Sequence, residues 1–158
     1  QLIPLLNDYA EAVIAAVHGA GGDVLKLIGD GVLATFTAES PADACRAALV
    51  AEAELRARVS LLKERRRLEN LPTADVYIGL HLGDVYYGNI GSKNRLDFTV
   101  IGPAVNEVSR IEPLTKVLGH SILLTAAFAN LRSGIEVKSL GSHVLRGVRE
   151  PREIFTPD

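Results

Sequence analysis

The chain has 158 residues, of which 47% are hydrophobic and 23% are charged, which is typical of one globular domain with a sizeable core. A formal net charge of -2 argues against nucleic acid as the main partner, because proteins that bind the phosphate backbone are usually basic. No apolar run approaches the roughly 18 residues of a membrane-spanning helix, so we expect no membrane contact by this domain. The single cysteine, Cys45, cannot form an intramolecular disulfide, which favours a reducing, cytoplasmic location.

The beginning of the chain indicates a fragment of a longer protein. It starts at Gln1, and the sequence contains no methionine at all. We therefore expect residues 1–158 to form a single domain that is truncated at its N-terminus, and the attached domains of the parent protein are not readable from these residues.

The first part of the chain predicts a helix, a β-hairpin and a second helix. Apolar residues recur with helical spacing over residues 2–18. Residues 24–36 consist of two β-prone runs around Gly-Asp-Gly, which predicts a tight hairpin with Asp30 at its tip. Ser40-Pro41 predicts an N-cap followed by proline in the first helical position, and this helix should run to about Leu68.

The long helix is expected to bury one stripe of side chains and to end in a basic run. Lys63–Arg67 favours a solvated helix end, stabilised by the helix dipole, over a nucleic-acid site. Glu52 breaks the apolar pattern. The positions expected to be buried are Cys45, Ala48, Leu55, Val59 and Leu62.

The second part of the chain predicts short strands mixed with helices. Gly83-Asp84 is expected to join the first two strands as a second hairpin, and Gly119 to end the longer helix. The mixture favours an α+β sandwich with an antiparallel-rich sheet and helices on one face. The expected strands are 75–82, 85–90, 98–101, 121–124, 137–140, 142–145 and 153–155, and the expected helices are 103–117 and 126–131.

Two charged residues of the first hairpin carry the strongest chemical signal. Asp30 alone is an ordinary turn residue, because Asp-Gly is a common hairpin dipeptide. A carboxylate at a hairpin tip is nevertheless a hard oxygen ligand for a divalent metal. Lys26 lies four residues earlier, and this pairing of cation and anion indicates a site for a phosphorylated substrate.

Histidine offers no comparable signal. His81 lies in the middle of a predicted strand among apolar neighbours, so we expect a core histidine with satisfied hydrogen bonds rather than a metal ligand. His18, His120 and His143 have no ligand-like spacing.

Several blocks of the sequence resemble the catalytic domain of class III nucleotidyl cyclases, the adenylate and guanylate cyclases. They are spread over most of the chain in the order of that family, and they comprise Val24–Phe36, Tyr86–Ser92, Arg95–Asn106, Arg110 and Leu145–Pro151. The resemblance implies an α/β fold with a ferredoxin-like, palm-type sheet, here without its first strand.

The resemblance implies a phosphorus-oxygen lyase that converts ATP to cyclic AMP and pyrophosphate with two Mg²⁺ or Mn²⁺ ions. In the family, the aspartate matching Asp30 and one from an earlier Phe-x-Asp strand hold both ions. No such segment precedes residues 2–18. We therefore expect these 158 residues on their own to be inactive.

The resemblance also assigns the remaining site residues. Lys26 and Thr99 match the positions that read the purine, and an ammonium with a hydroxyl favours ATP over GTP. Thr99 further resembles a threonine-type subclass often stimulated by bicarbonate, and so implies sensitivity to that ion. Asn106 would orient the ribose, while Arg110 would stabilise charge on the α-phosphate through its donor fork.

Two more positions qualify this assignment. Arg146, and with less support Arg149, matches the basic residue that contacts the β- and γ-phosphates. Glu107 departs from the small or apolar residue usual in the family, and at i to i+3 it is expected to pair with Arg110 and blunt its role.

In the resembling family, one protomer supplies the metal aspartates and the other supplies the purine reader and the Asn/Arg pair. We therefore expect a homodimer with two composite sites. The alternatives are a catalytically silent cyclase-like dimerisation module and a guanylate cyclase. A diguanylate cyclase is disfavoured, because its Gly-Gly-Asp/Glu-Glu-Phe signature loop is absent.

Overall fold

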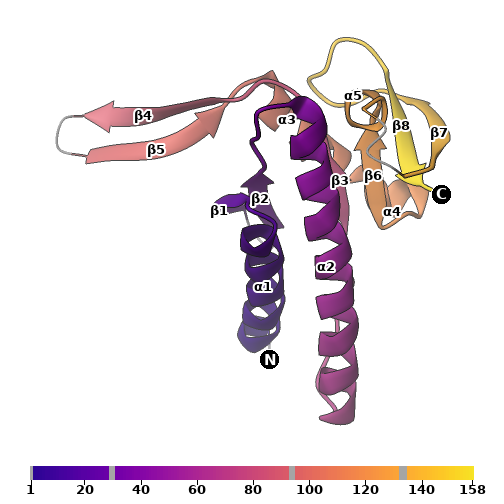
Figure 1. Ribbon diagram of the computed structural model, residues 1–158. Coiled ribbons are helices and arrows are strands. Elements are labelled where there is room, and N and C mark those ends of the chain that lie inside the picture. The colour runs from indigo at the N-terminus through magenta and orange to yellow at the C-terminus, as the bar shows by residue number, and fades with distance from the viewer. Residues whose placement is uncertain (1, 29–30, 93–94, 132–134) are drawn as a thin grey trace. The chain divides into compact units, whose positions relative to one another are not determined.

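The computed structural model describes residues 2–28, 31–92, 95–131 and 135–158. Within these ranges it describes only the backbone of residues 26–28, 89–92 and 95–99. The chain divides into two compact units, Gln1–Val76 and Tyr77–Asp158. Figure 1 shows the helices and strands of both units. The expectation of one catalytic domain over residues 1–158 stays a prediction.

The first unit contains two helices and a β-hairpin, as predicted. Helix α1 spans Leu2–Gly19, strands β1 (Asp23–Ile28) and β2 (Gly31–Thr35) pair antiparallel, and helix α2 spans Pro41–Leu68. The predicted cap is confirmed, because the Ser40 hydroxyl accepts a hydrogen bond from the Asp43 N–H at 3.1 Å.

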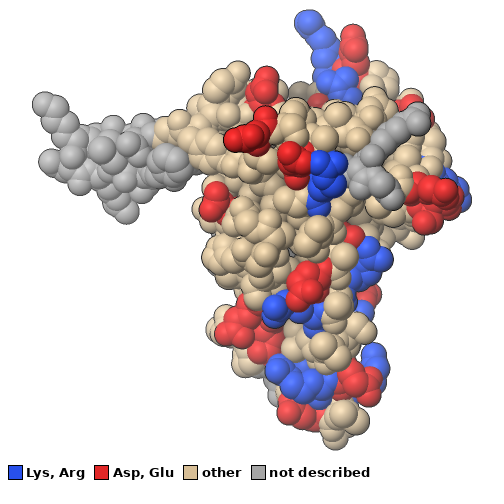
Figure 2. All heavy atoms as spheres, in the orientation of Figure 1, with Lys and Arg blue, Asp and Glu red and all other residues tan. Residues whose placement is uncertain are grey.

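The buried stripe of α2 contains the five predicted apolar positions together with two charged residues. Glu52 is only 6% exposed, and its carboxylate accepts a hydrogen bond from Arg56 Nε at 2.7 Å. Charges elsewhere on the helix are paired at the surface, as for Arg58 and Glu54, and basic and acidic side chains are interspersed on the face shown in Figure 2.

The prediction of a fully solvated basic helix end is wrong for Arg66. This side chain is 2% exposed, whereas Arg65 and Arg67 are exposed as expected. Arg66 forms an ion pair with Asp8 of α1, and its Nε donates to the Pro72 carbonyl at 2.6 Å. The basic run thus contains a buried connection between α1, α2 and the segment after α2.

The described residues of the second unit form a four-stranded sheet, a separate two-stranded ribbon and three helices. The sheet has the order β3-β6-β8-β7, in which β3 and β6 are parallel and the other neighbours antiparallel. The elements are β3 (Ile78–Leu80), β4 (Tyr86–Ser92), β5 (Arg95–Ile101), α3 (Pro103–Ile111), α4 (Leu114–Leu118), β6 (Ile122–Thr125), α5 (Ala126–Ala129), β7 (Val137–His143) and β8 (Arg152–Pro157). The predicted mixed, antiparallel-rich α/β class is confirmed.

The predicted pairing of the second hairpin is wrong. Strand β3 does not pair with β4 across Gly83-Asp84, because β3 lies beside β6 instead. Strand β4 pairs antiparallel with β5, with Tyr86 opposite Ile101 and Gly88 opposite Thr99 (Figure 1). The long strand predicted over residues 75–82 is also shortened to the three residues of β3.

The predicted helix over residues 103–117 is two helices. Pro113 lacks an N–H and restricts its predecessor, so α3 ends at Ile111 and α4 begins at Leu114. Gly119 ends α4 as predicted, with the left-handed φ of 72° that glycine tolerates best. One buried hydrophobic cluster of this unit contains Ile111, Leu123, Leu145 and Ile154.

Candidate active site

Two of the predicted site residues belong to the hairpin of the first unit. Lys26 lies in β1, opposite Leu33 of β2, and its side chain is outside the described residues. Asp30 lies outside the described residues altogether. The strands that flank it are in register, with Ile28 opposite Gly31.

The other four predicted residues belong to the second unit. Thr99 lies in β5, and its side chain is outside the described part of the chain. Asn106 and Arg110 both lie on α3 and are both exposed, so the structure places this pair on the solvent side of one helix. Arg146 is exposed in the turn between Leu145 and Val148, whose N–H donates to the Leu145 carbonyl at 3.0 Å.

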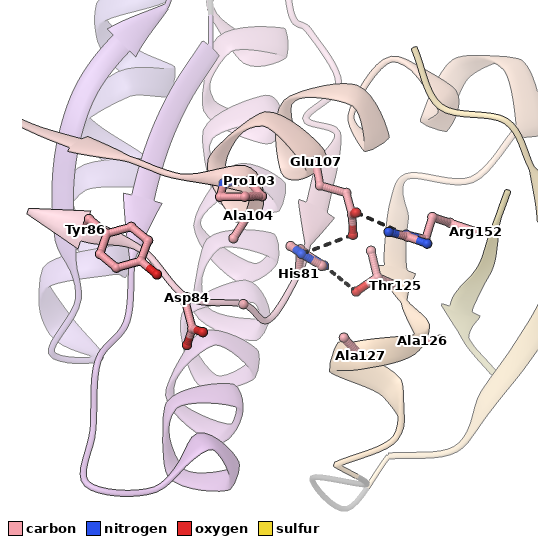
Figure 3. A pocket seen from close by; sticks show the side chains of 11 residues that line it. His81, Asp84, Tyr86, Pro103, Ala104, Glu107, Thr125, Ala126, Ala127 and Arg152 are labelled. Carbon is pink, nitrogen blue, oxygen red and sulfur yellow. Dashed lines mark hydrogen bonds and ion pairs between the residues drawn. The ribbon is translucent and has the colours of Figure 1, made fainter. Parts of the chain in front are cut away.

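Helix α3 turns a different face toward a pocket of about 410 Å³. Figure 3 shows three of the lining side chains, His81, Glu107 and Arg152, in a connected row. Glu107 Oε2 lies 3.1 Å from His81 Nε2, and Glu107 Oε1 lies 3.1 Å from Arg152 Nε. The other lining residues are Gly83, Asp84, Tyr86, Pro103, Ala104, Thr125, Ala126 and Ala127.

The contacts of His81 with Thr125 and Glu107 favour one tautomer. Its Nδ1 lies 2.8 Å from Thr125 Oγ1, which already accepts the Phe128 N–H at 3.4 Å as the N-cap of α5. A carboxylate only accepts, so Nε2 carries the proton toward Glu107, and the Thr125 hydroxyl donates to Nδ1. His81 therefore has a partner at both ring nitrogens, and the prediction of a satisfied histidine is confirmed.

The surroundings of His81 favour its neutral form. Burial lowers the pKa of His81, the Glu107 carboxylate raises it, and the Arg152 guanidinium lowers it again. The net direction is below the ordinary pKa of a histidine, since burial is the largest of these effects.

The expected pairing of Glu107 with Arg110 is wrong. Glu107 is directed toward the pocket and pairs with His81 and Arg152, while Arg110 is exposed on α3. Sequence analysis missed Arg152 altogether. Its signal was weak, because one arginine at the start of a short strand is normally a surface residue.

Within residues 2–28, 31–92, 95–131 and 135–158, no three His, Cys, Asp or Glu side chains gather closely enough to hold a metal ion. No helix in the same ranges combines the length and apolar character needed to cross a bilayer.

Curated proteins that resemble this chain in sequence include named adenylate cyclases. No family model matches the chain. The chain is 38% identical over 129 residues to the adenylate cyclase of Anabaena cylindrica. The aligned region covers 79% of this chain and 25% of that protein. It spans about a quarter of the length of the curated relatives it matches.

Solved structures match over nearly the whole chain. The adenylyl cyclase CyaB from P. aeruginosa superimposes with a TM-score of 0.87 at 25% identity, covering 99% of this chain and 82% of the other. The guanylyl cyclase Cya2 superimposes with a TM-score of 0.81 at 25% identity, covering 98% and 79%. The predicted fold is therefore found in proteins of both nucleotide preferences.

Proposed function

The chain belongs to the class III nucleotidyl cyclase catalytic domains, and we propose that the protein carrying it converts ATP to 3′,5′-cyclic AMP and pyrophosphate. The observation that carries this proposal is the exposed face of α3, which presents Asn106 and Arg110 together while Glu107 of the same helix is engaged elsewhere. The similarity to adenylate cyclases from two bacteria supports the choice of reaction.

In the proposed reaction, the ribose 3′-oxygen attacks the α-phosphorus in line. A bond from O3′ to phosphorus forms, the bond from phosphorus to the bridging oxygen of the β-phosphate breaks, and pyrophosphate leaves. Asn106 would hold the ribose, and Arg110 would donate to the α-phosphate oxygens as their charge grows. Arg146 would contact the β- and γ-phosphates, which orients the leaving group.

The hairpin of the first unit would supply the metal and base contacts. A carboxylate such as Asp30 fits Mg²⁺ or Mn²⁺, which prefer hard oxygen ligands and retain waters and substrate phosphates. Two such ions, when bound, would lower the pKa of the 3′-hydroxyl and offset the triphosphate charge. Lys26 and Thr99 would read the adenine edge, as in the threonine-type subclass.

We propose that each site is shared between two copies of the chain. Asp30 of one copy would serve the site to which the other copy contributes Lys26, Thr99, Asn106 and Arg110. A two-fold axis then generates two equivalent sites. The chain spans about a quarter of the length of its curated relatives, so activity is measured in the full-length protein.

The base preference tests the substrate assignment. The full-length protein with Mn²⁺ is expected to form cyclic AMP from ATP faster than cyclic GMP from GTP. Lys26→Ala is expected to lower the ratio of kcat/KM for ATP over GTP about tenfold or more, because the adenine N1 loses its donor. Both products are measured by chromatography after incubation with each nucleotide.

Two outcomes contradict this assignment. A faster reaction with GTP would favour the guanylate cyclase alternative, for which the similarity to Cya2 is the relevant observation. If the protein binds nucleotide but forms neither cyclic AMP nor cyclic GMP, the alternative of a silent dimerisation module is favoured. An unchanged preference in Lys26→Ala would remove Lys26 from base recognition.

Arg110 is expected to act on the transition state rather than on substrate binding. Arg110→Ala should lower kcat about 10²-fold to 10³-fold, the usual loss for one donor to a developing oxyanion, with KM for ATP nearly unchanged. Arg110 is exposed, so its removal leaves the buried core of α3 intact. Steady-state kinetics on the purified full-length variant measure both constants, and a rise in KM without loss of kcat would contradict the role.

A further inference from the structure

Helix α3 contacts the rest of its unit at both of its ends. Its one fully buried residue is Ile111, at the C-terminal end. Its N-cap, Gly102, makes no side-chain capping bond. Near the N-terminus of the helix, Ala104 packs closely on Gly83. A Cβ atom added to Gly83 would lie 2.7 Å from the Cβ atom of Ala104. In the middle of the helix, Val105 and Val108 are half-buried.

Glu107 occupies that middle position. Residues 104, 107 and 111 follow the spacing of one helix face, and Glu107 is the polar member of this otherwise apolar set. Its side chain is 12% exposed and contacts two other elements, the segment after β3 through His81 and strand β8 through Arg152. Burial of a carboxylate is costly unless it is paired, and these two partners satisfy that requirement.

The network continues beyond Glu107. His81 connects to Thr125, and Thr125 caps α5. One row of polar groups therefore runs from Arg152 through Glu107 and His81 to the start of α5, as Figure 3 shows for its first four members. Such a row restricts the rotation and the translation of α3 at one point, because these contacts weaken steeply away from their preferred distances and angles.

We propose that Glu107, held by His81 and Arg152, is a positioning residue that fixes the orientation in which α3 presents Asn106 and Arg110 to the substrate. This inference rests on the proposed function. In the helical projection, Glu107 lies about 60° from Arg110, between the exposed pair and the buried face. A change at Glu107 therefore acts on the direction of Arg110 without removing any group that touches ATP.

Glu107→Gln tests the proposal, because it keeps the size of the side chain and removes its charge. We expect kcat in the full-length protein to fall about tenfold with KM for ATP within about threefold, the pattern of a misplaced transition-state contact. Glu112→Gln is the matched control, since Glu112 is an exposed glutamate at the end of the same helix. Equal kinetics of the two variants would overturn the proposal.

Two measurements without turnover separate this proposal from the assigned reaction. Amide hydrogen exchange across residues 104–111 is expected to be faster in Glu107→Gln than in Glu112→Gln, and equal exchange would overturn the proposal even in an active enzyme. If the wild-type protein forms no cyclic nucleotide, the proposed function fails, while the exchange experiment still decides whether Glu107 holds α3.

The titration of His81, followed by NMR, tests the network itself. The groups around His81 are Glu107 from α3, Arg152 from β8, Thr125 from the end of β6 and Asp84 from its own segment. Glu107→Gln is expected to lower the pKa of His81, because a carboxylate stabilises the imidazolium, and Arg152→Gln is expected to raise it. Shifts in the same direction, or no shift in either variant, would overturn the network.

Discussion

Replacing Asp30 with alanine is expected to abolish cyclic AMP formation in the full-length protein, with a loss of at least about 10³-fold in kcat/KM. The proposed site has two metal carboxylates, and neither waters nor substrate phosphates replace the charge of the missing one. The measurement is cyclic AMP formation with saturating Mn²⁺, followed by titration of Mn²⁺ to high concentration. A raised Mn²⁺ requirement in Asp30→Asn would support direct coordination.

Asp23 provides the matched control for this substitution. It is an exposed aspartate at the other end of the same hairpin, where β1 begins and pairs with Thr35 of β2. Asp23→Asn is expected to leave activity within about twofold, because a change at an exposed site away from special contacts has little effect. If Asp30→Ala retained the wild-type rate, or if Asp23→Asn lost as much activity, the metal assignment of Asp30 would be wrong.

The strand register around Asp30 gives this prediction its physical basis. Ile28 stands opposite Gly31, so the pairing of β1 with β2 extends to the residues on either side of positions 29 and 30, which lie outside the described residues. Glycine follows Asp30 directly in the sequence, and Gly-Asp-Gly is the pattern from which the hairpin was predicted. The sequence pattern alone was sufficient to predict this much of the hairpin.

Local signals in the sequence predicted the elements that depend on local chemistry. Ser40 and Pro41 define the start of α2, and Gly119 ends α4, because a cap or a left-handed residue acts within one turn of its own position. Strand pairing is different. The parallel pairing of β3 with β6 joins segments far apart in the chain, and no residue near Gly83 encodes it.

In the candidate site too, the sequence predicted the features that depend on neighbouring residues but not the contacts between distant segments. The spacing of Asn106 and Arg110 predicted a shared helix face, and the structure places both on the exposed side of α3. The partner of Glu107 was predicted wrongly as Arg110, because only neighbours on the same helix are visible in the sequence. Its actual partners, His81 and Arg152, come from two other elements of the sheet region.

Arg66 illustrates the largest difference between a sequence pattern and a folded environment. It lies within Lys63–Arg67, where every residue reads as a solvated surface charge. In the structure its guanidinium is enclosed, pairs with Asp8, and donates to the Pro72 carbonyl at 2.6 Å. The Leu71 N–H in turn donates to the Arg66 carbonyl at 2.7 Å, so both the side chain and the backbone of Arg66 hold the segment that leaves α2.

Removing this side chain is expected to destabilise the first unit strongly. Arg66→Ala should lower the free energy of unfolding by about 3 kcal/mol, the low end of the range for breaking a buried ion pair, because Asp8 is 30% exposed and regains some water. The loss includes the packing of the arginine stem as well as its charge. Urea unfolding of the chain, followed by far-UV circular dichroism, measures the change.

Arg65 supplies a control that contacts the same carboxylate. Its guanidinium lies 2.9 Å from Asp8 but is 57% exposed, so Arg65→Ala should cost only about 0.5 kcal/mol. The two variants remove the same residue type, from adjacent positions of one helix, and differ chiefly in burial. Equal destabilisation by both would mean that the pairing with Asp8, and not the enclosure of Arg66, determines the effect. A larger loss in Arg66→Ala than in Asp8→Ala would assign the remainder to the packing of the arginine stem and to the Pro72 carbonyl, which only Arg66 contacts among the described side chains of this cluster.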